Sequence, residues 1–254
     1  MLRGIYMAGS GMVAEQAWLD ALAGDVANVN TPGYRRTADS FDSYLEPQLQ
    51  RNVNGLFQAA LGPVSYGSAF LTYGGVDRMG PMTPTGRPLD LALAQQGWWF
   101  AVRRDDGSTG YVRTLALRPD STGLLVNPDG LPVLSVTGQP LRLPPGTGED
   151  QVRVDSGGRL LAGGQTVGQL AVVRLDGPIV PAPDGTYAGS PAPAGLGAPA
   201  GLVVSGVLEG SNVALSSAMV DLIRAQRAYQ LSASALRTED QELGRLYGLA
   251  STVT

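Results

Sequence analysis

Apolar residues recur at intervals of three and four near both ends of this 254-residue chain, and this spacing constrains the fold more than any other feature. It places side chains on one narrow stripe of an α-helix, which is typical of helices that pair with another helix. The two patterned segments, residues 2–29 and 211–247, enclose a long middle rich in Gly and Pro. The arrangement predicts ends that pair with each other or with neighbouring copies, as in an assembly subunit.

The first stripe lies within residues 2–29 and should end at a defined turn. Pro32 disfavours helical backbone at Thr31, and Gly33 tolerates a positive φ, so the helix should stop after Val29. Glu15 is the one residue that interrupts the apolar stripe. The candidate pairing residues of this helix are Ile5, Met12, Leu19, Leu22 and Val26.

The second stripe predicts a helix of about 35 residues that begins at Ser211 or Asn212, since both residue types are good N-caps. So long a helix with so narrow a stripe favours a coiled-coil partner. A helical hairpin that packs on its own domain is an equally open interpretation, and the two roles can coexist. The candidate pairing residues of this helix are Leu215, Met219, Leu222, Tyr229, Leu236 and Leu243.

The middle of the chain holds most of the 35 Gly and 18 Pro residues, which indicates many short elements joined by turns. Short apolar runs are separated by turn sequences at residues 105–107, 128–130 and 156–158, a rhythm that predicts β-hairpins. We expect Trp98, Trp99 and Phe100 to pack in a core, and we favour this over a sugar-binding surface. The middle therefore predicts an all-β barrel or sandwich.

The expected fold class is α+β, with N- and C-terminal helices that pair as a coiled coil and a central all-β domain. Composition and turn sequences divide the chain into five segments. They are an N-terminal helix and exit turn (residues 1–49), a connector (50–80), the central β-domain (81–176), a Gly/Pro/Ala-rich connector with a return strand (177–206) and the C-terminal helix (207–254).

The composition excludes several classes of active site. The chain has no cysteine and no histidine, so disulfides, thiolate or imidazole metal ligands, cysteine nucleophiles and triads with a His base are absent. A net charge of -4 gives no basic surface for nucleic acid, and no P-loop or GxSxG motif is present. We expect no catalytic, cofactor-binding or metal-binding residues. A carboxylate pair of the glycosidase type is the enzymatic alternative.

The first 24 residues lack the continuous apolar core of a signal peptide, because Gly9, Ser10 and Glu15 are among the residues that interrupt it. No apolar stretch reaches the length of about 18 residues that spans a bilayer. We therefore expect no membrane span, and a chain that is cytosolic or exported without a cleaved apolar signal.

Three stretches resemble bacterial flagellar axial proteins, the family of rod, hook and hook-associated subunits. Residues 27–36 (ANVNTPGYRR) resemble the N-terminal signature, and residues 207–229 (VLEGSNVALSSAMVDLIRAQRAY) resemble the C-terminal signature. Residues 89–102, 111–113 and 123–130 are similar to the β-domain pattern of rod and hook proteins. The matched motif residues at the two ends are Asn28, Thr31, Pro32, Gly33, Tyr34, Ser211, Asn212, Val213, Gln226, Arg227 and Tyr229.

The length of the chain favours a basal-body rod protein, either of the distal-rod type or a close relative in the proximal rod. This resemblance implies a structural subunit without cofactors, whose paired terminal helices line the inner tube of a helical filament that transmits torque from motor to hook. Its partners would be copies of itself, other rod and hook proteins and the flagellar type III export apparatus. A hook-type or adaptor subunit is one alternative, and a β-rich cell-wall glycan enzyme is another.

Overall fold

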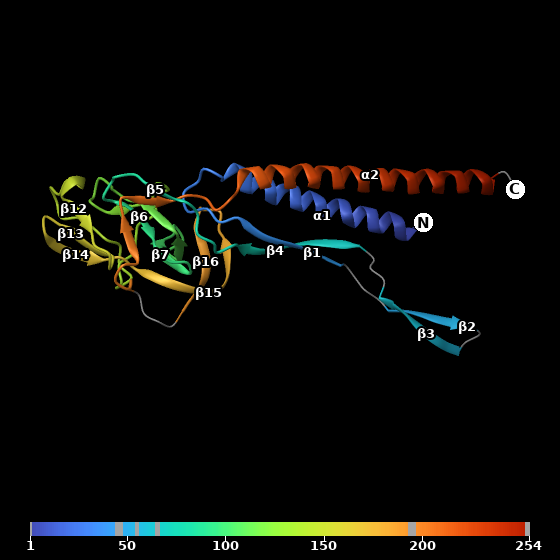
Figure 1. Ribbon diagram of the computed structural model, residues 1–254, viewed down its shortest axis with the longest axis horizontal. Helices are drawn as coiled ribbons and strands as arrows, with labels where there is room; N and C mark the ends of the chain where they lie inside the picture. Colours follow the sequence, from blue (N-terminus) through green and yellow to red (C-terminus); the bar gives the residue numbers. More distant parts are fainter. Residues whose placement is uncertain (1, 44–47, 54–55, 64–66, 193–196, 252–254) are drawn as a thin grey trace. The chain divides into compact units, whose positions relative to one another are not determined.

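The computed structural model describes residues 2–43, 48–53, 56–63, 67–192 and 197–251 (Figure 1). It has one helix at each end, α1 (Leu2–Ala27) and α2 (Leu215–Ser251), and a β-rich region between them. The predicted α+β class is confirmed. The first helix ends two residues earlier than expected, and the second begins at Leu215 rather than at Ser211 or Asn212. No helix among the described residues is long and apolar enough to cross a membrane.

The region between the helices consists of short strands and one 3-10 helix, η1 (Glu149–Gln151). The strands are β1 (Thr37–Ser43), β2 (Gln48–Val53), β3 (Leu56–Pro63), β4 (Ser68–Gly75), β5 (Met82–Pro84), β6 (Asp90–Leu93), β7 (Trp98–Arg103), β8 (Thr109–Val112), β9 (Thr114–Ala116), β10 (Arg118–Pro119), β11 (Leu125–Val126), β12 (Val152–Val154), β13 (Arg159–Ala162), β14 (Gln165–Gln169), β15 (Val172–Pro181), β16 (Tyr187–Pro191), β17 (Val203–Ser205) and β18 (Val207–Glu209).

These strands form several small sheets. Strands β15, β16, β8 and β7 close into a barrel, and two three-stranded sheets have the orders β17-β6-β9 and β12-β13-β14. The remaining strands pair two by two, as β1 with β4, β2 with β3, β5 with β18, and β10 with β11. The β-rich middle predicted from the sequence is confirmed, and it contains a barrel.

The chain forms two compact units, each assembled from segments that are far apart in sequence. The helix unit comprises Met1–Val26, Asp39–Thr72 and Leu215–Thr254, and the β-unit comprises Ala27–Ala38 and Tyr73–Ala214. These two units differ from the five segments expected from the sequence, and the boundaries of those segments stay a prediction. Strands β2, β3 and β4 lie largely within residues 50–80, which the sequence suggested to be a connector.

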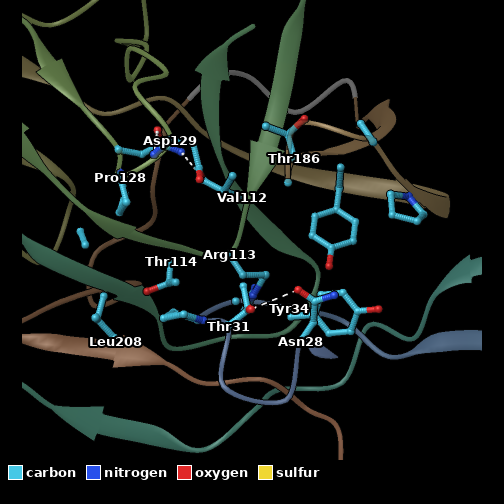
Figure 2. Close-up of a pocket in the computed structure, with 18 of the residues that line it drawn as sticks. Asn28, Thr31, Tyr34, Val112, Arg113, Thr114, Pro128, Asp129, Thr186 and Leu208 are labelled. Carbon is cyan, nitrogen blue, oxygen red and sulfur yellow. Dashed lines mark hydrogen bonds between the residues drawn. The ribbon is translucent and has the colours of Figure 1, made fainter. Parts of the chain in front are cut away.

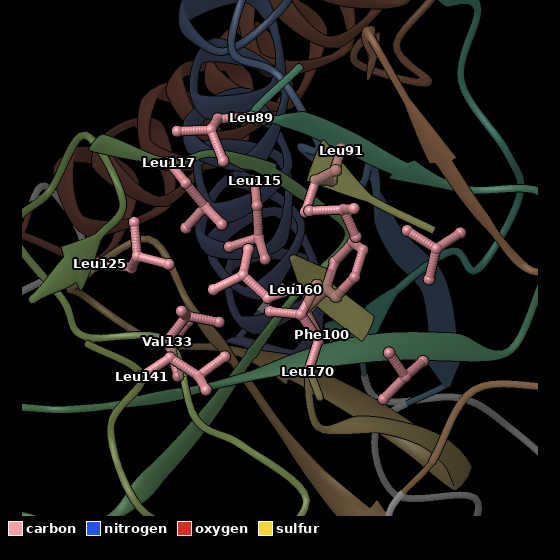
Figure 3. Packing of buried hydrophobic residues seen from close by; sticks show 14 of the residues in the cluster. Leu89, Leu91, Phe100, Leu115, Leu117, Leu125, Val133, Leu141, Leu160 and Leu170 are labelled. Atoms are coloured by element: carbon pink, nitrogen blue, oxygen red, sulfur yellow. The ribbon is translucent and has the colours of Figure 1, made fainter. Parts of the chain in front are cut away.

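The core of the β-unit is built from leucine, valine and phenylalanine side chains that are nearly all fully buried (Figure 3). Leu91 from β6, Phe100 from β7 and Leu115 from β9 lie together in it. Trp99 is fully buried in a second cluster with Tyr111 and Tyr187, whereas Trp98 is only partly buried. The predicted packing role of both tryptophans is confirmed, and successive side chains on β7 serve opposite faces.

One five-residue turn recurs at six places in the described β-unit. In each turn the N–H of the fourth residue donates to the carbonyl of the first, and the N–H of the first donates to the carbonyl of the fifth. The fourth residue is always a glycine with φ between 75° and 83°, the geometry of a type I turn followed by a glycine bulge. These glycines are Gly107, Gly123, Gly130, Gly138, Gly158 and Gly185.

In four of these turns the side chain of the first residue accepts a hydrogen bond from the backbone N–H two residues later. The acceptors are Asp120, Asn127, Ser135 and Asp155, at donor–acceptor distances of 2.7, 3.1, 3.3 and 2.9 Å. Their polar atoms therefore satisfy the backbone of the turn, as expected for Asp and Asn at such positions.

Replacing a glycine of the recurring turn should destabilise the β-unit even where space is free. A Cβ atom on Gly130 would meet nothing within 4 Å, but its φ of +83° is unfavourable for an L side chain. We expect Gly130→Ala to lower the free energy of unfolding by about 1–2 kcal/mol in urea titrations. Gly148→Ala is the matched control, since that site is equally open and lacks the positive φ. Equal effects of the two changes would contradict this account.

Candidate functional site

A cluster of buried charges centred on Glu209 joins the two terminal motifs inside the β-unit. Arg35 Nη2 lies 2.6 Å from Glu209 Oε1, and Arg113 Nη2 and Nε lie 2.9 and 3.0 Å from Glu209 Oε2. All three side chains are fully buried. One carboxylate from β18 therefore binds a guanidinium of the N-terminal motif and another from the turn between β8 and β9.

Arg113 is held by the surrounding backbone as well as by Glu209. Its Nη1 donates to the carbonyls of Gln95, at 2.9 Å, and of Trp98. Both Arg113 and Arg35 lie near the ring of Trp99, with Cζ to ring-centroid distances of 5.7 and 5.8 Å. Nε, Nη1 and Nη2 of Arg113 all meet acceptors, whereas Arg35 donates from Nη2 to Glu209, and both guanidinium groups lie near an aromatic ring in a buried interior. This arrangement is suited to arginine and not to lysine.

The electrostatics of the cluster depend on Glu209 and Asp77. Burial lowers the pKa of the Arg113 guanidinium from its usual value, and the charge of Glu209 acts in the opposite direction. Asp77 Oδ1 lies 3.8 Å from Arg35 Nε, which places a second carboxylate near the second guanidinium. Two buried cations are thereby matched by two carboxylates, as burial of charge requires.

Backbone hydrogen bonds extend this junction along both motifs. The N–H of Gly33 donates to the carbonyl of Glu209 at 2.8 Å, where the φ of +76° at Gly33 permits the close approach. The N–H of Arg36 donates to Asn212 Oδ1 at 2.6 Å, and Asn212 Nδ2 donates to the carbonyls of Val76 and Arg78. Residues 33–36 are therefore hydrogen-bonded to residues 209–212.

The hydrogen bonds of Asn212 explain why the second helix begins later than expected. The Asn212 side chain is hydrogen-bonded to the backbone of Arg36 and of Val76, so it cannot cap a helix at the same time. Ser211 Oγ accepts only from the N–H of Val213, at 3.2 Å, and both residues are buried. The expectation that Ser211 or Asn212 is the N-cap of α2 is wrong.

The N-terminal motif also lines a pocket of about 360 Å³ in the β-unit (Figure 2). Thr31 Oγ1 and Asn28 Oδ1 are 3.1 Å apart at one side of it, and Asn127 Nδ2 donates to Asp129 Oδ2 at another. These polar groups bond to one another, which is the pattern of structural turns rather than of a ligand site. Within the described part of the chain, no group of three or more Asp or Glu side chains could hold a metal ion.

The predicted pairing residues lie in the helix unit, where α1 and α2 run antiparallel side by side (Figure 1). Ser232 Oγ on α2 donates to Glu15 Oε1 on α1 at 3.1 Å. A Cβ atom on Gly11 would lie 3.4 Å from Ser232 Oγ, and one on Gly4 would meet the carboxylate of Glu239. The glycines of α1 thus admit polar side chains of α2 at close range.

Nine of the eleven predicted stripe residues are buried or partly buried within one chain. Leu22 is 2% exposed, and seven further stripe residues are partly buried: Ile5, Met12, Leu19, Val26, Leu222, Tyr229 and Leu236. Leu243 is also partly buried. In contrast, Leu215 and Met219 are exposed, and the buried positions in this part of α2 are Ala218, one residue before Met219, and Ala225.

The remaining motif residues of α2, Gln226 and Arg227, are exposed, and Pro32 lies exposed in the turn after α1. The structure also reveals functional residues that the sequence analysis missed, namely Arg35, Asp77, Arg113 and Glu209. Three of these lie inside the quoted motif stretches, and only 16% of the chain is charged. The available signal was the presence of a charged residue beside buried apolar residues in each of these stretches.

Comparison with known families gives two matches, one at each end of the chain. The family described as "Flagella basal body rod protein" matches residues 5–35, and "Flagellar basal body rod FlgEFG protein C-terminal" matches residues 204–249. Both matched segments include residues of the Glu209 junction.

Individual relatives match over nearly the full length. The chain is 30% identical to flagellar basal-body rod protein FlgG of Agrobacterium fabrum, over 94% of this chain and 96% of that protein. It is 29% identical to FlgG of Bacillus subtilis, over 98% and 99% of the two chains. It is 32% identical to FlgF of Escherichia coli, over 90% of each.

Removing the charge of Glu209 should destabilise the β-unit strongly. Glu209→Gln would leave two buried guanidinium groups without their carboxylate, and we expect a loss of about 3–5 kcal/mol in the free energy of unfolding. Asp176→Ala is the control, because its ion pair with Arg174 is 63% exposed on both sides and should contribute less than about 1 kcal/mol. Chemical denaturation measures both changes, and a Glu209→Gln effect as small as the control would refute the role of the cluster.

Proposed function

The chain belongs to the family of flagellar basal-body rod proteins, and from this premise we propose that it assembles helically with copies of itself and transmits torque from motor to hook. It is a structural subunit of the basal-body rod. The observation that carries the proposal is the joining of both terminal motifs at one buried junction in a chain that matches rod proteins from end to end. A torque-bearing subunit needs such interlocked ends, and it needs no catalytic step.

We propose that the terminal helices pair as a coiled coil. The hydrogen bond between Glu15 and Ser232 and the close approach of Gly11 to Ser232 support this pairing. The partial burial of Leu222, Tyr229 and Leu236 at seven-residue intervals supports it as well. This spacing is the heptad repeat of a coiled-coil seam.

Contacts between copies would use the apolar side chains that the helix pair leaves exposed. On α2 they include Met219, Val220 and Ile223, which are 47–52% exposed, and on α1 they include Tyr6 and Val13, each 72% exposed. Exposed apolar surface of this extent marks interaction sites. Because the two exposed rows lie on different helices, a contact of one row with the other would be heterologous and could repeat without closing, as a filament requires.

The remaining partners follow from the family. The matched relatives include FlgG and FlgF proteins at similar identity, and we propose a subunit of the distal-rod type or a close relative in the proximal rod. Other rod and hook proteins would then be its neighbours. Delivery by the flagellar type III export apparatus, without a cleaved signal peptide, belongs to the same proposal.

Charges placed on the exposed row should block assembly and spare the monomer. We expect Met219→Asp and Ile223→Asp to abolish motility when they complement a strain that lacks its own copy, with truncated basal bodies in electron micrographs. Their effect on monomer unfolding should stay below about 1 kcal/mol, because both sites are exposed. Leu222→Asp and Leu236→Asp should block assembly and also weaken helix pairing, since they place a charge in the seam.

Ala235→Asp is the control, an exposed site of α2 that lies 12 residues beyond Ile223, and it should leave motility intact. Normal rods built from Met219→Asp or Ile223→Asp would contradict the assignment of this surface. Intact flagella in the deletion strain would contradict the function itself.

A further inference from the structure

Two close approaches define the register of α1 on α2. The first is between Gly4 and the carboxylate of Glu239, and the second is between Gly11 and Ser232. On each helix the two contacting residues are seven apart, in opposite directions along the chain. The register therefore repeats with the heptad, and a slip by one heptad would bring equivalent helix faces together.

Glu15 breaks this equivalence. Its Oε1 accepts a hydrogen bond from Ser232 Oγ at 3.1 Å, whereas its Oε2 is buried without a hydrogen-bond partner. A carboxylate in such a place is costly, because a buried polar atom without a partner loses its hydration. Glu15 therefore contributes to the specificity of the register and not to stability, as single polar residues do in coiled-coil seams.

Both one-heptad slips are unfavourable for Glu15. A slip toward the start of α2 would set it against Ala225, which is fully buried and has no side-chain donor. A slip toward the end of α2 would set it against Glu239, another carboxylate. In the observed register alone it meets a hydroxyl donor.

We infer that Glu15 is the residue that selects the register of α1 on α2, by hydrogen bonding to Ser232 and by rejecting Ala225 and Glu239. The inference rests on the proposed pairing of the terminal helices. It makes Glu15 a specificity determinant of assembly, because the faces exposed for the next copy depend on this register.

The pairing itself can be tested first, in a chain that has no native cysteine. A Cβ atom on Gly11 would lie 4.0 Å from Ser232 Cβ, which suits a disulfide. The Gly11→Cys/Ser232→Cys chain should therefore cross-link on mild oxidation within the monomer. If it does not, the proposed helix pairing fails, and the register inference fails with it.

Register slips are reported by two other cysteine pairs that leave Glu15, Ser232 and Glu239 in place. Gly11→Cys/Ala225→Cys reports the slip toward the start of α2, and Gly4→Cys/Leu246→Cys reports the slip toward its end. With Glu15 present we expect little cross-linking of either pair. With Glu15→Leu we expect both cross-links to rise by about tenfold, since the unpaired carboxylate is gone.

Glu15→Gln separates the two sources of specificity. A glutamine oxygen can still accept from Ser232 and would still be unpaired against Ala225, so the Gly11→Cys/Ala225→Cys cross-link should stay low. The repulsion from Glu239 is removed, and the Gly4→Cys/Leu246→Cys cross-link should rise. If the native pair cross-links while neither slipped pair responds to Glu15→Leu, the chain connections alone fix the register and the inference is overturned.

Discussion

The Glu209 carboxylate is the interaction on which the arrangement of the β-unit depends. It forms ion pairs with Arg35 and Arg113 in a fully buried environment, and the backbone carbonyl of Glu209 accepts a hydrogen bond from the N–H of Gly33. The segment that follows α1 is thereby built into a domain whose other strands come from residues 73 onward. Because the same carboxylate precedes α2 by only a few residues, one cluster in the β-unit joins the segment that follows α1 to the segment that precedes α2.

Two further carboxylates of the β-unit stabilise its turns. Asp120 and Asp155 bond to the backbone of the recurring five-residue turn, as Asn127 and Ser135 do. This use of polar side chains lets many short strands connect tightly around a leucine-rich core.

Much of the fold was predictable from local patterns. Heptad spacing predicted both helices, and turn sequences such as residues 128–130 predicted the β-rich middle. The start of α2 was not predictable, because Asn212 looks like a cap and is instead bonded to Arg36. The buried positions Ala218 and Ala225 were also missed, because periodicity favours large apolar residues at the buried positions of a helix and these two are small. The Glu209 cluster joins residues more than 90 positions apart, and no spacing rule carries that information.

The most direct test of this account is amide hydrogen exchange at the N-terminal motif. The N–H groups of Gly33 and Arg36 are bound to Glu209 and Asn212, so they should exchange only when the whole β-unit unfolds, with the same free energy as the amides of its core strands. Exchange of these two amides at the rate of free peptide, while the core of the β-unit remains protected, would show that the motif is not part of the β-unit and would contradict the central claim.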